Sequence, residues 1–197
     1  MGTVLARDTG TRSGAGPSDA ALVLAARAGE AWATEALFRR HARAANGLAF
    51  RLMGRDADVD DLVQDAFVFA FVRLGSLEDP QAFAAWLRSI VVRTATKVIR
   101  RRRLLERLGL RRRGEPVDID AMAAKAAGPD VVAELRRTYD LLERLPADER
   151  IALLLQRAEG LALQEIADAM GVSLATAKRR IACGERALQL LARRGEP

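Results

Sequence analysis

The sequence has very few of the residues that build metal and catalytic centres. Among its 197 residues there is one cysteine, Cys183, and one histidine, His41. Disulfide frameworks and structural zinc sites need several such residues, so both are excluded. His41 falls on an apolar helical stripe, which favours packing over ligation or catalysis. Because there is also no Gly-rich phosphate loop and no Ser/His/Asp set, we expect no enzyme, no cofactor and no metal.

Long apolar runs and aromatic residues are also scarce. No window approaches the length of about 20 apolar residues that a membrane-spanning helix needs. Residues 1–17 are rich in Gly, Ser, Thr and Ala and lack the apolar stretch of a signal peptide. We therefore expect a cytoplasmic protein without membrane insertion, with a disordered tail over these residues. Aromatic residues make up 5% of the chain, and the abundance of Ala, Leu and Arg favours helices over strands.

The charge of the chain is unbalanced toward arginine. Lys and Arg number 32 against 26 Asp and Glu, which gives a formal net charge of +6. The planar donor fork of arginine suits phosphate groups. The excess therefore favours a nucleic acid or another anionic surface as partner, although the charge alone does not choose between them.

Apolar periodicity and chain breakers predict an all-α protein of two small domains. Residues 18–103 are expected to form a helical bundle, and residues 130–194 a domain that ends in a helix-turn-helix. Residues 104–129 carry arginine runs with Gly109 and Pro116 among them, which is typical of a flexible basic linker. The predicted helices of the bundle cover about 18–28, 30–53, 57–74 and 79–103.

The third of these helices has a clear apolar face and an acidic start. Its predicted core positions recur at steps of three and four, and they are Val59, Leu62, Val63, Ala66, Phe67, Ala70 and Leu74. Acidic side chains at a helix start interact favourably with the helix dipole. This interaction is enough to explain Asp60 and Asp61, so their position at the helix start does not by itself indicate a binding site.

Residues 164–181 have the form of a helix-turn-helix. Gly171 permits the tight turn, and Ser173 is expected to cap the second helix. Ala175, Thr176, Arg179 and Cys183 fall on its exposed face, where a helix can enter the DNA major groove. A helical hairpin that binds no DNA is the alternative, but the complete turn chemistry favours DNA. The predicted DNA contacts are Ser173, Ala175, Thr176, Lys178, Arg179 and Arg180.

A second candidate surface lies on the fourth predicted helix. Trp86, Arg93, Lys97 and Arg100 fall on one narrow stripe beside the apolar face. An aromatic side chain at the head of a basic stripe suits single-stranded DNA, because bases stack on the ring and phosphates pair with the cations. In the alternative interpretation Trp86 belongs to the core and the cations form a solvated face, and periodicity leaves both open.

Over residues from about 19 to 192, the chain resembles a known family, the extracytoplasmic-function (ECF) sigma factors of bacterial RNA polymerase. Residues 60–67 read DDLVQDAF, which is similar to the family's acidic signature, and residues 145–150 read LPADER, which is similar to the motif before its helix-turn-helix. Trp86-Leu87 matches a further family motif. The order and spacing of these motifs carry the resemblance.

The resemblance implies that the protein recognises the −10 and −35 promoter elements and promotes transcription initiation by RNA polymerase. The partners are core RNA polymerase, through its β′ clamp helices and β flap, promoter DNA, and an anti-sigma factor. The helix-turn-helix is implied to read the −35 promoter element. The other implied contacts are Asp60, Asp61, Gln64 and Asp65 for the polymerase, and Trp86, Arg93, Lys97, Arg100 and Arg101 for the −10 element.

The sequence departs from the family pattern at a few positions. Arg93 and Lys97 stand where the family usually has Asn and Asp, Ala162 replaces a capping Ser or Thr, and Ala177 replaces the usual Val. A stand-alone helix-turn-helix regulator is the alternative function, but it gives no role to residues 60–67. A nonspecific nucleic-acid-binding protein would account for the charge only.

Overall fold

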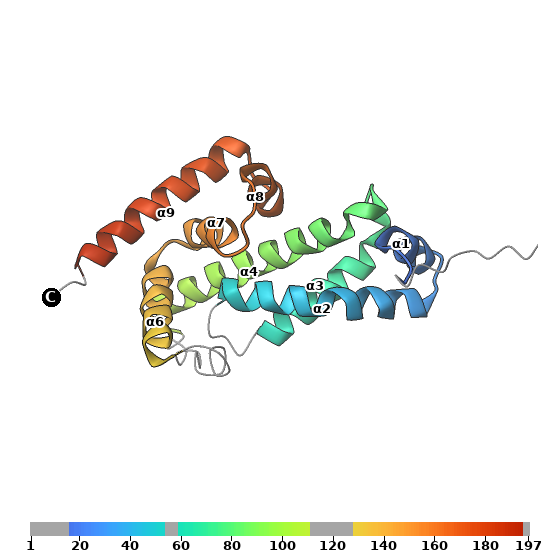
Figure 1. The fold of residues 1–197 in the computed structure, drawn as a ribbon, viewed down its shortest axis with the longest axis horizontal. Helices are drawn as coiled ribbons and strands as arrows, with labels where there is room; N and C mark the ends of the chain where they lie inside the picture. Colours follow the sequence, from blue (N-terminus) through green and yellow to red (C-terminus); the bar gives the residue numbers. More distant parts are fainter. Residues whose placement is uncertain (1–15, 54–58, 111–127, 195–197) are drawn as a thin grey trace, which may run out of the picture.

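The computed structural model describes residues 16–53, 59–110 and 128–194, and every regular element in these ranges is helical, which confirms the all-α class. Figure 1 shows two groups of helices along an elongated molecule. The first group consists of α1 (Asp19–Arg27), α2 (Ala31–Met53), α3 (Val59–Val72) and α4 (Phe83–Arg107), with the 3-10 turns η1 (Leu74–Ser76) and η2 (Pro80–Ala82) before α4. The second group consists of α6 (Pro129–Arg144), α7 (Ala147–Arg157), α8 (Leu163–Met170) and α9 (Leu174–Arg194).

Two predicted segments fall largely outside these ranges. They are the N-terminal tail, of which residues 16 and 17 are described, and the linker, of which 104–110 and 128–129 are described. The described start of the linker is helical, because α4 continues past the predicted boundary at Arg103 to Arg107.

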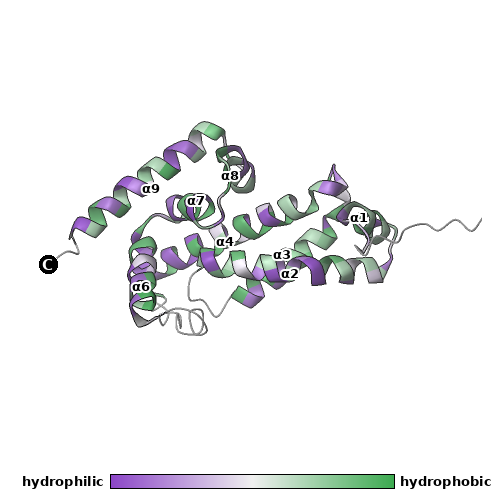
Figure 2. Ribbon diagram, in the orientation of Figure 1, coloured by the Kyte–Doolittle hydropathy of each residue, from purple (hydrophilic) through white to green (hydrophobic). Residues whose placement is uncertain are grey.

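The first group is held together by apolar faces that repeat at helical spacing. All seven predicted core positions of the third helix are buried, from Val59 to Leu74. They pack α3 against α2 and α4, and Figure 2 shows hydrophobic and hydrophilic residues alternating along these helices. The start of the fourth helix also agrees with the prediction, since the Asp79 carboxylate accepts a hydrogen bond from the Gln81 amide at 2.8 Å. Its first turn, however, is the 3-10 turn η2.

His41 helps to join α1 to α2. Its Nε2 atom lies 2.9 Å from a carboxylate oxygen of Asp19, and its ring centroid lies 5.2 Å from that of Phe83. Arg40 donates a hydrogen bond of 2.7 Å to the same carboxylate. Burial raises the pKa of Asp19, but the contacts with Arg40 and His41 outweigh burial and hold the pKa below its ordinary value of 3.8. His41 therefore has a structural role, because its contact with Asp19 joins α2 to α1.

The second group contains the helix-turn-helix formed by α8 and α9. Gly171 ends α8 in the left-handed conformation, with φ of 64°, which glycine adopts without steric cost. The Ser173 hydroxyl accepts a hydrogen bond from the Thr176 amide at 3.2 Å and so caps α9 as predicted. At the start of α8, Ala162 offers no capping side chain. The Glu165 carboxylate nevertheless accepts a hydrogen bond from the Ala162 amide at 2.9 Å, which supplies half of a capping box.

A close crossing of α7 and α9 depends on Gly184. A methyl group at this position would lie 2.8 Å from Leu153 Cδ1 and 3.2 Å from the carbonyl oxygen of Glu149. We expect Gly184→Val to lower the free energy of unfolding by about 1–3 kcal/mol, because the buried Leu153 and the α7 backbone must move apart. Gly47→Val is the matched control, since the atoms nearest to a side chain there belong to the flexible guanidinium of Arg51. Urea titrations followed by circular dichroism compare the two, and equal midpoints would contradict the expectation.

The two groups of helices pack against one another. Helix α4 of the first group contacts both α7 and α8 of the second, and α2 contacts α7. The buried apolar residues of both groups belong to one hydrophobic cluster. This packing brings the two predicted DNA-binding surfaces close together, which periodicity along the chain could not show.

Candidate nucleic-acid interface

The N-terminal half of α9 presents the side chains predicted to read duplex DNA. Ala175, Lys178 and Arg179 are exposed, and Thr176 is half-buried with its hydroxyl 2.9 Å from that of Ser173. The opposite side of the helix is fixed by Ala177 and Ile181, which are buried. The structure therefore gives this helix one packed face and one free face with two cations on it, as entry into a major groove requires.

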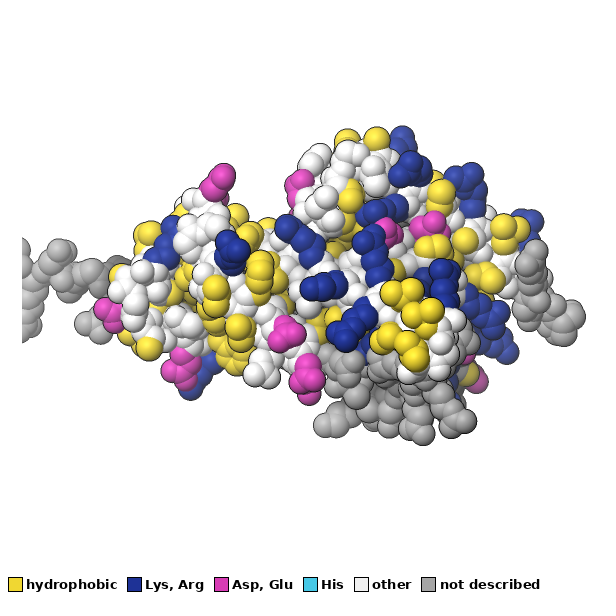
Figure 3. Space-filling view, turned by 180° about the vertical axis from the view of Figure 1, so that it is seen from behind, with side chains coloured by type: hydrophobic (Ala, Val, Ile, Leu, Met, Phe, Trp, Pro, Cys, Tyr) yellow, Lys and Arg dark blue, Asp and Glu magenta, His cyan; other side chains and the backbone are white. Residues whose placement is uncertain are grey.

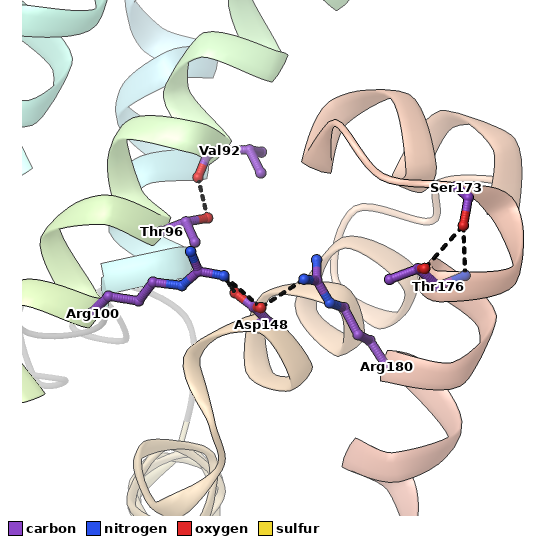
Figure 4. A network of polar contacts seen from close by, with 7 residues as sticks. All are labelled: Val92, Thr96, Arg100, Asp148, Ser173, Thr176 and Arg180. Carbon is purple, nitrogen blue, oxygen red and sulfur yellow. Dashed lines mark hydrogen bonds and ion pairs between the residues drawn. The ribbon is translucent and has the colours of Figure 1, made fainter.

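Arg180 is placed differently from its neighbours on α9. Its guanidinium turns toward α7 and lies 2.7 Å from a carboxylate oxygen of Asp148. Arg100 of α4 reaches the same carboxylate from the other side, with distances of 2.7 and 2.6 Å from its Nη2 to the two oxygens. Figure 4 shows the two arginines converging on Asp148 from α4 and α9. Two cations predicted to contact different promoter elements thus share one acidic partner.

The predicted stripe on α4 is present and has internal support. Arg93 donates a hydrogen bond of 2.9 Å to the Ser89 hydroxyl, which donates to the Trp86 carbonyl at 2.7 Å. Arg93, Lys97 and Arg100 are exposed along the helix. Trp86 is half-buried, and its ring centroid lies 6.2 Å from that of Phe83. Trp86 therefore packs at the edge of the core and keeps part of its surface free.

Arg101 does not lie with the stripe. It lines a separate hollow between α3 and α4, together with Asp61 and Asp65. One residue advances the side chain by about 100° around a helix, so Arg101 cannot share a narrow face with Arg100. The structure thus groups this cation with the predicted polymerase contact.

The acidic signature forms an exposed surface on α3. Asp60, Asp61, Gln64 and Asp65 are all exposed, on the side of the helix away from its buried row. The same surface continues along α3 with three exposed apolar side chains that the sequence reasoning missed, Val68, Phe69 and Val72. Phe69 is 52% and Val72 76% exposed. The available signal was that all three are apolar but lie outside the predicted core row.

The last residue of the 145–150 motif is buried. Arg150 is 4% exposed, on the inner side of α7. Burial lowers the pKa of Arg150, while the nearby charge of Glu143 acts in the opposite direction. This arginine is therefore a structural part of the second group of helices and is not available to DNA.

The basic side chains gather where the two groups meet. Figure 3 shows Lys and Arg across the middle of one face of the molecule. One hollow there is lined by Arg93, Lys97, Arg100 and Arg180, beside the turn at residues 170–172. Among the residues that the structure describes, no group of three or more Cys, His, Asp or Glu side chains could hold a metal ion. None of the described helices is long and apolar enough to cross a membrane.

Comparison with known proteins assigns both groups of helices to known protein families. The family model "Sigma-70 region 2" matches residues 37–105, and "Sigma-70, region 4" matches residues 135–188. ECF RNA polymerase sigma factor SigM of Mycobacterium tuberculosis is 34% identical over 166 residues, which cover 84% of this chain and 80% of SigM. This chain belongs to the ECF sigma factors of RNA polymerase. The match to region 2 takes in the surfaces on α3 and α4 for which a stand-alone regulator has no use.

Other sigma factors give the same assignment. ECF RNA polymerase sigma factor SigE of Mycolicibacterium smegmatis is 32% identical over 157 residues, although this chain spans only 59% of the length of SigE. Among solved structures, CnrH in complex with the cytosolic domain of CnrY has a TM-score of 0.61 and 27% identity, over 91% of this sigma factor and all of that chain. RpoE of Bartonella quintana, in complex with the anti-sigma factor NepR, shares the fold with a TM-score of 0.62 and 23% identity.

Proposed function

We propose that this sigma factor binds core RNA polymerase through α3, holds the opened −10 strand on α4 and reads the −35 duplex with α9. The supporting observation is that α3, α4 and α9 each present exposed side chains of the predicted kind beside a face buried in the common core. Residues 18–103 and 130–194 act as the two functional domains. The protein acts in the cytoplasm and catalyses no reaction itself. Its activity is controlled by an anti-sigma factor, as the complex of the similar sigma factor RpoE with the anti-sigma factor NepR suggests.

The polymerase surface on α3 combines charge and apolar area. The carboxylates of Asp61 and Asp65 lie in the first half of the helix, and Val68 and Val72 continue the same stripe at steps of three and four residues. Protein interfaces typically have an apolar centre with a polar rim. We infer that the carboxylates orient core polymerase, while Val68, Phe69 and Val72 supply the area that becomes buried.

The −10 surface on α4 is suited to a single strand. The stripe from Trp86 to Arg100 spans about 21 Å at 1.5 Å per residue, which is enough to follow several nucleotides. The free part of the Trp86 ring offers a stacking surface, and the three cations follow it toward the end of α4. Lys97→Ala is expected to reduce the salt dependence of open-complex formation, because each cation paired with a single strand adds about 0.7 to the salt slope.

Two exposed cations near the start of α9, Lys178 and Arg179, are expected to make different kinds of DNA contact. Arg179 faces away from the domain core near the start of the helix, where side chains reach base edges, and Lys178 lies at the rim, near the phosphates. Arg179→Ala should cost about 1–3 kcal/mol on a matched promoter and relax specificity at one position. Lys178→Ala should weaken all sequences alike, because phosphates carry no sequence information.

Footprinting of both variants, as holoenzyme, on a matched promoter and on one with a mutated −35 element tests this assignment. Arg186→Ala is a useful control, because Arg186 lies further along α9 and donates a hydrogen bond to the Ala182 carbonyl at 3.1 Å. Equal losses on both promoters for Arg179→Ala would refute its base-reading role. A loss for Lys178→Ala that depends on the −35 sequence would refute its assignment to phosphate.

A further inference from the structure

A hollow where the two groups of helices meet is rich in arginine. It is formed by α4, the start of α7 and α9, and it encloses about 540 Å³. That volume lies within the range of about 300–1,000 Å³ that is typical of small-molecule sites. The hollow differs from the one beside residues 170–172, although two arginines border both. Its five arginines are Arg100, Arg103, Arg107, Arg179 and Arg180.

The positive charge of this hollow is only partly balanced. The Asp148 carboxylate is one of two that line it beside the five arginines, which leaves an excess of three positive charges. Arg100 and Arg180 share this one carboxylate, as Figure 4 shows. In the part of the chain that the structure describes, no acidic side chain pairs with Arg107 or Arg179. The hollow therefore has cations available to an anion that enters it.

The shape and charge of the hollow select the chemistry of a ligand. A concave site with charges of one sign concentrates counter-ions more strongly than a flat surface does. Guanidinium groups bind phosphate oxygens through paired hydrogen bonds. A single phosphate group carries a charge of about −1.5 to −2 at pH 7, which does not balance three positive charges. A chain of linked phosphates does, and its oxygens can pair with arginines from both α4 and α9.

We propose that this hollow is a binding site for a small anion with three linked phosphate groups. The arginines of α4 and α9 hold the phosphates between them. Leu104, Ala147 and Cys183 also line the hollow and add less polar surface, on which the base and sugar of a nucleoside triphosphate would pack. An inorganic triphosphate would use the arginines alone. The two sources share the same phosphate chemistry and differ in whether this less polar surface contributes.

Binding at this hollow goes beyond promoter recognition. Arg103 and Arg107 are not among the predicted promoter contacts, whereas Arg100, Arg179 and Arg180 are. A bound triphosphate would compete with promoter phosphates for these three side chains, so promoter binding would respond to its concentration. This consequence rests on the proposed function, but the binding itself does not.

Cys183 reports directly on occupancy of the hollow. It is the only cysteine of the chain, it lines the hollow, and it is half-buried. Iodoacetamide, an uncharged thiol reagent, is added to the free full-length protein with increasing inorganic triphosphate, without divalent cations and at constant ionic strength. Saturating triphosphate should slow alkylation roughly fivefold, and the concentration dependence gives its Kd. A rise in melting temperature with triphosphate concentration should accompany the protection.

Three substitutions locate the site. Arg107→Ala removes an exposed cation of the hollow and should raise the Kd of triphosphate roughly tenfold. Lys178→Ala makes the same change of charge on α9 but outside the hollow, so its Kd should stay within about twofold of the wild-type value. Glu149→Gln removes the second lining carboxylate, which repels phosphate, and should lower the Kd roughly threefold. The opposite directions of these effects separate altered affinity from damage to the fold.

Parallel titrations with GTP and ATP distinguish the two sources. Tighter protection of Cys183 by either nucleotide than by inorganic triphosphate would identify a nucleoside triphosphate as the ligand. Equal or weaker protection by the nucleotides would identify the phosphate chain as the whole determinant.

Several outcomes would overturn the proposal. It fails if triphosphate below about 1 mM does not protect Cys183, or if sulfate at the same ionic strength protects it equally. It also fails if Arg107→Ala and Lys178→Ala weaken binding to the same extent, because binding would then follow net charge alone. Protection by a short DNA duplex without protection by triphosphate would assign these arginines to DNA only. Failure to assemble with core polymerase would instead overturn the proposed function and leave this result standing, since the measurement needs neither polymerase nor promoter.

Discussion

Asp61→Arg is expected to abolish assembly with core RNA polymerase while helix content stays native. Asp61 is exposed on α3, so the change leaves the buried row of that helix intact. An acidic surface is complementary to a cationic one, and a like charge placed in such a contact costs several kcal/mol. A loss of about 3 kcal/mol lowers the affinity more than a hundredfold. Titration of core polymerase against the labelled variant measures the effect directly.

Two further variants make the Asp61 result specific. Glu78→Arg makes the same charge change at an exposed position of the same domain, before α4, and should assemble normally. Phe69→Ser leaves every carboxylate in place and should weaken assembly through lost apolar area alone. Wild-type assembly by Asp61→Arg would show that α3 is not the polymerase surface. Normal assembly by Phe69→Ser would limit that surface to the acidic end of the helix.

Trp86→Ala is expected to leave closed complexes intact and to reduce open complexes. Stacking of a base on an aromatic side chain contributes about 1–3 kcal/mol, so the loss corresponds to roughly 5- to 150-fold. The half-buried position of Trp86 against Phe83 also predicts some loss of folding stability. This loss should stay below the about 3–5 kcal/mol that removal of a fully buried large aromatic side chain costs. Permanganate reactivity of the −10 thymines, measured beside a thermal melt, separates the two effects.

The controls for Trp86 use the second tryptophan and a conservative change. Trp32 is exposed at the start of α2, where its indole donates a hydrogen bond of 3.2 Å to Glu30, so Trp32→Ala should leave promoter opening unchanged. Trp86→Phe keeps a stacking surface and should restore part of the opening. A destabilised Trp86→Ala protein that opens promoters normally per folded molecule would leave Trp86 as a core residue without a role in DNA binding.

Local chemistry explains which features could be read from the sequence. The buried row of α3 follows from steps of three and four, and the turn at Gly171 and Ser173 follows from a left-handed glycine and a capping hydroxyl. Each of these features is decided within one or two helical turns. The same local rules correctly placed Asp79 as a cap but could not specify that the next turn is a 3-10 turn.

The features that sequence reasoning missed depend on contacts between helices that are far apart in the sequence. Periodicity gives α4 an exposed stripe, but it does not reveal that the helix-turn-helix packs on that stripe. Asp148 and Arg100 are 48 positions apart in the chain, and nothing near either residue specifies the other. The family resemblance assigns Arg101 to the −10 element together with Arg100, whereas the structure places Arg101 in the hollow between α3 and α4.

The division of α4 into faces has an evolutionary consequence. Substitutions of Phe83, Val91 or Ala95 disturb the core that α2 and α3 share, and purifying selection should hold these positions nearly constant. Arg93 and Lys97 lie on the exposed side of α4, so substitutions there leave this core intact. After a gene duplication, two paralogous copies could therefore diverge in promoter preference through one or two changes on this outer face. Both copies would keep the same helical core, while the sets of genes that they control could diverge quickly.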